Sequence, residues 1–108
     1  MKFKVAVATK GLKGLMDEVS CEFGRARTFT VIDLEDDQVK NVKVVDSPAA
    51  SYEHGAGPIV VKMLADMNVG VVVAGEFGLG ASVFLKDKNI RVVKVEAGTN
   101  VSRAVSIV

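Results

Sequence analysis

The hydrophobic pattern changes near the middle of the chain, and this change constrains the fold more than any other feature. Residues 3–8, 28–34 and 39–45 are β-rich runs, and the last two are separated by four polar residues at positions 35–38. Two such runs joined by a short polar loop predict an antiparallel hairpin. The first half of the chain is therefore expected to contribute antiparallel strands.

Strand-like and helix-like segments alternate in the second half. Gly57 and Pro58 open a segment in which Ile59, Met63 and Met67 recur at helical spacing, which predicts an amphipathic helix that begins near Pro58. The segments predicted after it are a strand at residues 69–74, a helix from Gly80 to Lys88 and a strand at residues 91–95.

A last helix is predicted to begin near Asn100, with Thr99 as its N-cap. Its apolar face consists of Val101, Ala104, Val105 and Val108. The whole order of elements predicts an α/β fold, a ribonuclease-H-like three-layer domain in which helices cover a mixed five-stranded sheet. A chain of 108 residues is long enough for one core, so we expect residues 1–108 to form a single domain.

Charge and composition exclude several classes of partner. The chain has 14 basic and 13 acidic residues, a formal net charge of +1, and no basic stripe that would neutralise phosphates, so nucleic acid is not expected as a partner. The apolar run at residues 5–8 is too short for a signal peptide or a membrane span, and one cysteine cannot form an internal disulfide. We therefore expect a cytoplasmic protein without a membrane partner.

The connection at residues 9–27 contains Cys21, Glu22 and Arg25. A Cys21 thiolate is a soft ligand for iron, copper or zinc, and Arg25 can complement the charge of a cluster or oxyanion. The alternative is structural: a half-buried cysteine and an arginine in a surface ion pair. Because the connection is glycine-containing and offers few residues to anchor it, we also expect residues 11–27 to be mobile without a ligand.

Two further loops contain candidate binding residues. His54, the only histidine, stands just ahead of the helix that begins near Pro58, and Gly55 and Gly57 allow the backbone to approach a ligand closely. Backbone amides at that helix N-terminus favour an anion. The alternative for His54 is a helix cap or a solvent-facing side chain.

The third loop, residues 75–80, has the pattern Gly-x-x-Gly-x-Gly between a strand and a helix, with Gly78 in its middle. Turns of this kind bind phosphate in dinucleotide folds, but those use Gly-x-Gly-x-x-Gly. The loop therefore lacks the dinucleotide fingerprint, and Gly78 is a candidate binding residue only by its position at a strand-to-helix turn.

Four motifs follow one another along nearly the whole chain. They are Phe-Gly-Arg-Ala at residues 23–26, Pro-Ala at 48–49 followed by His-Gly-Ala-Gly-Pro at 54–58, Val-Val-Val-Ala-Gly at 71–75, and Gly-Thr at 98–99. In this combination the chain resembles the dinitrogenase iron-molybdenum cofactor biosynthesis family. The resemblance implies a ribonuclease-H-like fold and, as in the family's characterised branches, carriage or insertion of an iron-molybdenum-sulfur cluster or its precursors.

The resemblance also implies a binding protein and not an enzyme, with cofactor-assembly proteins as partners. The expected cofactor-binding residues are Cys21, Glu22, Arg25, His54, Gly55, Gly57 and Gly78, of which His54 and Cys21 are the predicted metal ligands because they are the softest side chains here. Many similar members have a histidine where this chain has Glu22, which is a harder ligand. The alternative hypothesis is a nucleotide or small-anion binding module that uses only the glycine-rich loops and Arg25.

Overall fold

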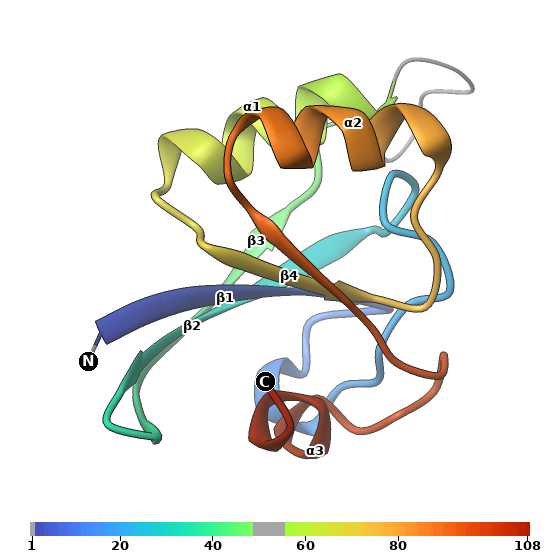
Figure 1. The fold of residues 1–108 in the computed structure, drawn as a ribbon. Coiled ribbons are helices and arrows are strands. Elements are labelled where there is room, and N and C mark those ends of the chain that lie inside the picture. The colour runs from blue at the N-terminus through green and yellow to red at the C-terminus, as the bar shows by residue number, and fades with distance from the viewer. Residues whose placement is uncertain (1, 49–55) are drawn as a thin grey trace.

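The computed structural model describes residues 2–48 and 56–108, and its strands form one mixed sheet with the order β3-β2-β1-β4-β5 (Figure 1). The strands are β1 (Lys2–Thr9), β2 (Thr28–Glu35), β3 (Gln38–Asp46), β4 (Val71–Ala74) and β5 (Arg91–Lys94). β1 pairs with β2 in the antiparallel sense and with β4 in the parallel sense. The mixed five-stranded sheet predicted from the sequence is confirmed.

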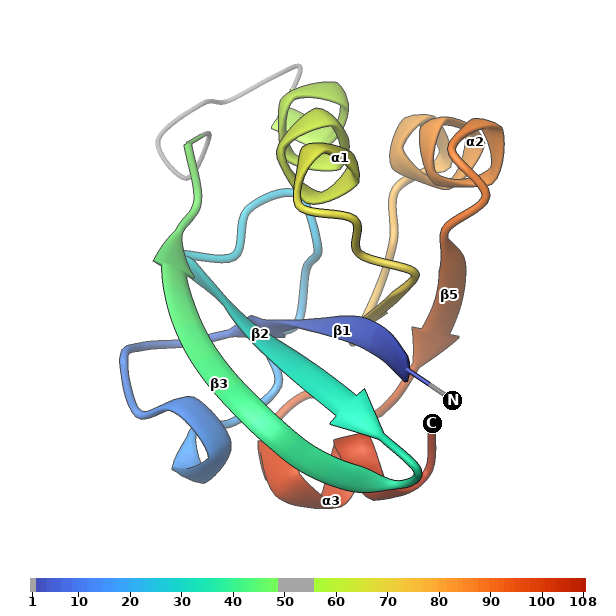
Figure 2. The same ribbon diagram turned by 90° about the vertical axis from the view of Figure 1, so that its left-hand side faces the viewer.

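Helices cover both faces of the sheet (Figures 1 and 2). α1 (Ala56–Asp66) and α2 (Leu79–Asp87) lie on one face, and α3 (Val101–Ser106) lies on the other with a short 3-10 helix, η1 (Gly14–Met16). The predicted helix starts near Pro58, Gly80 and Asn100 are therefore confirmed. No helix in these two described ranges is long and apolar enough to cross a membrane.

Each face has its own buried cluster, and residues of β1 alternate between them because successive strand side chains point to opposite faces. Ala6 and Ala8 of β1 pack toward α1 and α2, whereas Val5 and Val7 pack toward α3. This layered packing explains why residues 5–8 form an uninterrupted apolar run: β1 has a strand on each side and a helical layer on each face.

Two local predictions need correction. The hairpin turn consists of Asp36 and Asp37 alone, because Glu35 already pairs with Gln38 and both aspartates adopt positive φ angles of 52° and 67°. Positive φ at both central residues is the signature of a tight type I′ turn. At α3 the N-cap is Asn100 and not Thr99.

The Asn100 side chain accepts a hydrogen bond from the Arg103 backbone N–H at 3.3 Å. The hydroxyl of Thr99 instead donates to the carbonyl of Glu96 at 2.6 Å. Asn100 thus caps the helix, and Thr99 closes the turn that precedes it.

The expectation that residues 11–27 have few anchors is wrong. Val19, Phe23 and Ala26 are buried, and Val19 and Phe23 belong to the clusters on opposite faces of the sheet. Buried Asp17 accepts hydrogen bonds from the backbone N–H groups of Gly11 and Lys13 at 3.0 and 3.1 Å. The connection is therefore anchored on both sides of the sheet.

Candidate functional site

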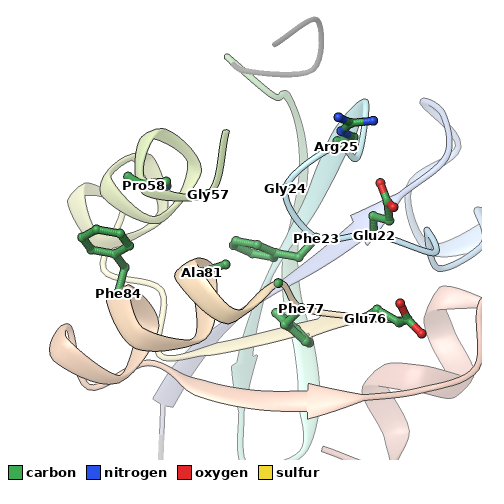
Figure 3. A pocket seen from close by; sticks show the side chains of 12 residues that line it. Glu22, Phe23, Gly24, Arg25, Gly57, Pro58, Glu76, Phe77, Ala81 and Phe84 are labelled. Carbon is green, nitrogen blue, oxygen red and sulfur yellow. The ribbon is translucent and has the colours of Figure 1, made fainter. Parts of the chain in front are cut away.

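An open pocket of about 440 Å³ lies where β1 and β4 end (Figure 3). These strands run parallel, so their carboxyl ends meet at one edge of the sheet, the usual position of ligand sites in α/β folds. The pocket is formed by four segments: the connection after β1, the start of α1, the loop between β4 and α2, and α2 itself. Its lining residues are Glu22, Phe23, Gly24, Arg25, Gly57, Pro58, Glu76, Phe77, Gly78, Gly80, Ala81 and Phe84.

The connection after β1 is joined to the loop after β4 by backbone hydrogen bonds. Phe23 donates its N–H to the carbonyl of Glu76 at 3.0 Å, and Gly75 donates to the carbonyl of Ser20 at 2.9 Å. A Cβ on Gly75 would lie 2.7 Å from the carbonyl oxygen of Cys21, closer than such atoms approach. Gly75 is therefore required by the contact between the two loops.

Aromatic side chains form the floor of the pocket. Phe23 is fully buried, and its ring lies 5.5 Å from that of Phe29 in an edge-on arrangement and 5.2 Å from that of Phe77. Aromatic pairs at these separations contribute about 0.5–1.5 kcal/mol beyond the burial of their area. Phe23 consequently anchors in the core the loop that carries Glu22 and Arg25.

Two helix N-termini face the same pocket. Gly57 and Pro58 lie in the first turn of α1, and Gly78 is the N-cap of α2 with no side chain to accept from the first-turn amides. A Cβ on Gly57 would lie 3.3 Å from that of Ala81, so the absence of a side chain there lets the two helices pack closely. Neither helix has an acidic residue in its first turn, so no carboxylate there offsets the positive dipole ends at the pocket.

Three charged side chains surround the opening. Glu22 and Glu76 are exposed and pair through an isolated parallel β-bridge, so their carboxylates lie on the same rim (Figure 3). Arg25 lines the pocket from the connection after β1. The site thus combines amide and guanidinium donors, which favour an anion, with two carboxylates at the rim.

The structure brings four of the predicted site residues together, since Glu22, Arg25, Gly57 and Gly78 all line the pocket. Cys21 is exposed and lies beside the rim, where its backbone contacts Gly75, but it is not a lining residue. The predictions for His54 and Gly55 lie outside the described residues. Among residues 2–48 and 56–108, no three His, Cys, Asp or Glu side chains gather as a metal-binding group.

Sequence reasoning missed Glu76, Phe77 and Phe84 as pocket residues. Glu76 and Phe77 lie within the glycine-rich loop, but only the bridge to Glu22 shows which way that loop faces. Phe84 had a usable signal: Ala81 and Leu85 form the buried stripe of α2, so a large ring next to that stripe is not required by the core.

Comparison with protein families gives a match over residues 1–107 to the family described as dinitrogenase iron-molybdenum cofactor. Among curated proteins, the uncharacterized protein MJ0580 of Methanocaldococcus jannaschii is 27% identical over 78 residues, which are 72% of this chain. The match covers 66% of that relative, just under two thirds of its length.

Solved structures share the fold. The apo form of the orange protein from Desulfovibrio gigas is 33% identical, with a TM-score of 0.84 over 94% of this chain and 82% of that protein. The crystal structure of PH0822 is 26% identical, with a TM-score of 0.82 over 95% of this chain and 86% of that one.

Proposed function

The chain belongs to the dinitrogenase iron-molybdenum cofactor family, and from this premise we propose that it is a non-catalytic carrier. Its cargo is an anionic iron-molybdenum-sulfur cluster, or a precursor of one, bound in the pocket between α1, α2 and the connection after β1. We further propose that residues 1–108 act as one cytoplasmic domain that exchanges its cargo with cofactor-assembly proteins. The strand order, with β2 antiparallel to β1, supports the ribonuclease-H-like assignment of the fold.

The observation that supports this function best is the convergence of two helix N-termini on one pocket. Sulfide-rich clusters of this class carry net negative charge, and amide groups at helix N-termini attract negative charge most strongly where solvent is partly excluded. Arg25 adds a guanidinium from the opposite side of the same pocket. A binding site of this kind needs no general base or nucleophile, which is the basis for proposing a carrier.

The predicted metal ligands stay part of the proposal. Cys21 is exposed and directly precedes Glu22, which lines the pocket, so its thiolate is the proposed ligand for a cluster that protrudes from the open pocket. His54 is the proposed imidazole ligand from the chain just before α1. Glu22 occupies the position where similar family members have histidine, and its harder carboxylate is the proposed reason for an altered metal preference.

One other function is supported by the same geometry. The amides at the N-termini of α1 and α2 can bind any compact anion without a metal ligand, which favours a nucleotide or small-anion binding module as the second candidate. Anaerobic purification with iron, molybdenum and sulfide analysis distinguishes the candidates. A coloured metal-bearing protein supports the carrier, and a colourless protein that retains nucleotide supports the alternative.

A pair of variants at Gly78 tests the pocket itself. A Cβ at Gly78 meets nothing within 4 Å, so both Asp and Asn fit as N-caps of α2. Gly78→Asp places a negative charge among the amides and should weaken binding of an isolated iron-molybdenum-sulfur cluster by at least about 10-fold, because like charges in close contact cost several kcal/mol. Gly78→Asn caps the same amides without the charge and should bind more tightly than Gly78→Asp.

Substitution of the proposed ligands tests their role in the same anaerobic titration. His54→Ala and Cys21→Ser should each weaken cluster binding by about 10-fold or more, the usual effect of losing a metal ligand or its support. Arg25→Ala should weaken it less and in a salt-dependent manner, since Arg25 is exposed and acts through screened charge. Failure of the wild-type protein to bind any such cluster would overturn the carrier function.

A further inference from the structure

Phe84 is the one exposed ring among the five phenylalanines, all of which lie in the described part of the chain. Its side chain is 42% exposed and lines the pocket from α2. In Figure 3 the ring lies beside Pro58, on the helical side of the pocket, across from Glu22 and Arg25. The pocket therefore has a charged side and an aromatic side.

Packing of the hydrophobic core does not require the Phe84 ring. α2 buries Ala81 and Leu85 against the sheet, whereas Phe84 belongs to neither buried cluster nor to the partly buried residues packed against them. Its neighbour Val83 is 60% exposed and does not line the pocket. Phe84 thus differs from an ordinary exposed apolar residue by its place on the pocket wall.

A ring in this position distinguishes ligands by their surface atoms. An oxyanion holds its water strongly and gains nothing from contact with a hydrocarbon surface, so the ring contributes nothing to its binding. Sulfur is more polarisable and less strongly hydrated, and it packs favourably at the edges of aromatic rings. The backbone amides bind either anion, and the ring would then make the pocket select the sulfur-bearing one.

We propose that Phe84 is a specificity-determining residue that makes the pocket prefer a metal anion with a sulfide surface over an oxyanion of the same shape and charge. This inference rests on the proposed function, because it concerns the ligand of that same pocket. It adds the chemical basis on which a carrier would reject molybdate-like anions while retaining sulfide-coordinated metal.

The test uses tetrathiomolybdate and molybdate, two tetrahedral dianions that differ only in sulfur against oxygen. Dissociation constants are measured anaerobically by calorimetry for the wild type and for Phe84→Ala, Phe84→Leu and Val83→Ala. We expect the wild type to bind tetrathiomolybdate more tightly than molybdate. Phe84→Ala should weaken tetrathiomolybdate binding by about 2- to 10-fold, as loss of a sulfur–aromatic contact implies, and leave molybdate binding unchanged.

The other two variants separate aromatic character from size and from general surface effects. Phe84→Leu keeps an apolar side chain and should still lose much of the preference for sulfur, whereas Val83→Ala should retain all of it. Because Phe84 is exposed, these variants should unfold at the wild-type denaturant midpoint, which verifies that any loss of binding is local.

Equal weakening of both anions by Phe84→Ala, or none for either, would overturn the inference. Binding of ADP that depends on Phe84, with no preference between the two molybdenum anions, would also overturn it. In that case the ring would serve to stack on a nucleobase. The carrier function fails separately, when the wild type binds no sulfide-coordinated metal at all. Retained cluster binding in Phe84→Ala together with lost binding in Gly78→Asp would leave the carrier function intact and remove only the role of Phe84.

Discussion

The two faces of the sheet are covered by layers that are held in different ways. α1 and α2 have eleven and nine residues and pack through a large apolar cluster, whereas α3 has six residues, too few for a helix that is stable by itself. Backbone hydrogen bonds join α3 and the residue before its cap to the connection that precedes β2. The N–H of Val101 donates to the carbonyl of Asp17 at 2.9 Å, and the N–H of Val19 donates to the carbonyl of Thr99 at 2.8 Å.

The difference shows that the connection after β1 serves both faces and the pocket at once. Val19 inserts into the cluster under α3, Phe23 inserts into the cluster under α1 and α2, and Glu22 between them reaches the rim. A substitution of Val19 or Phe23 should therefore alter the geometry of the pocket as well as the stability of the core.

Phe23→Ala is expected to have the largest effect on stability. It removes a fully buried ring and its contacts with Phe29 and Phe77, so the free energy of unfolding should fall by about 3–5 kcal/mol. Urea denaturation followed by circular dichroism measures this. Val83→Ala, exposed on α2, is the control and should stay within about 0.5 kcal/mol of wild type.

Gly75→Ala breaks the contact between the two pocket loops. The new Cβ would meet the backbone of Cys21, which cannot move as a flexible side chain would, and we expect a loss of about 1–3 kcal/mol. Amide chemical shifts should change most at residues 20–23, whose backbone must move. Gly78→Ala adds the same methyl group in open space, so equal losses in the two variants would contradict the explanation.

Val19→Ala disturbs the cluster under α3. Less apolar area is lost than in Phe23→Ala, because valine is smaller than phenylalanine. Loss of two buried methyl groups at about 0.8 kcal/mol each, with a small cavity, predicts a destabilisation of about 2 kcal/mol. Native-state hydrogen exchange should show faster opening of α3 than of α1, because only α3 depends on this anchor. Uniform acceleration in all helices would mean that the two faces open as one unit.

Asn100→Ala should have the smallest effect, confined to α3. Loss of the side-chain acceptor for the Arg103 N–H typically costs about 1 kcal/mol. Asn100→Asp preserves the acceptor and should restore stability, which thermal unfolding can measure. If both substitutions destabilise equally, the cap is not the source of the effect.

The order of strands and helices followed from the sequence alone. The helix starts near Pro58, Gly80 and Asn100 and the hairpin after residue 28 were predictable because hydrophobic periodicity is a local property of the chain. The two errors within these elements, at the hairpin turn and at the cap of α3, were confined to one or two residues. Thr99 and Asn100 are both good caps, and backbone angles that no pattern specifies decided between them.

For the binding residues, too, the sequence determined some features and left others open. The sequence by itself singled out Glu22, Arg25, Gly57 and Gly78, because charged residues and glycines in connecting segments are recognisable without a fold. It did not show that Val19 and Phe23 anchor the connection on opposite faces, since irregular spacing in a loop has no periodicity from which burial can be inferred.

Only the tertiary structure decided which side chains share the pocket. Glu76 lies beside Glu22 because a bridge joins two loops more than fifty residues apart in the chain, and Phe84 lines the pocket because of the rotation of α2 on the sheet. Both placements depend on packing between distant segments. Local sequence determines which elements form, and long-range packing determines which of their side chains meet.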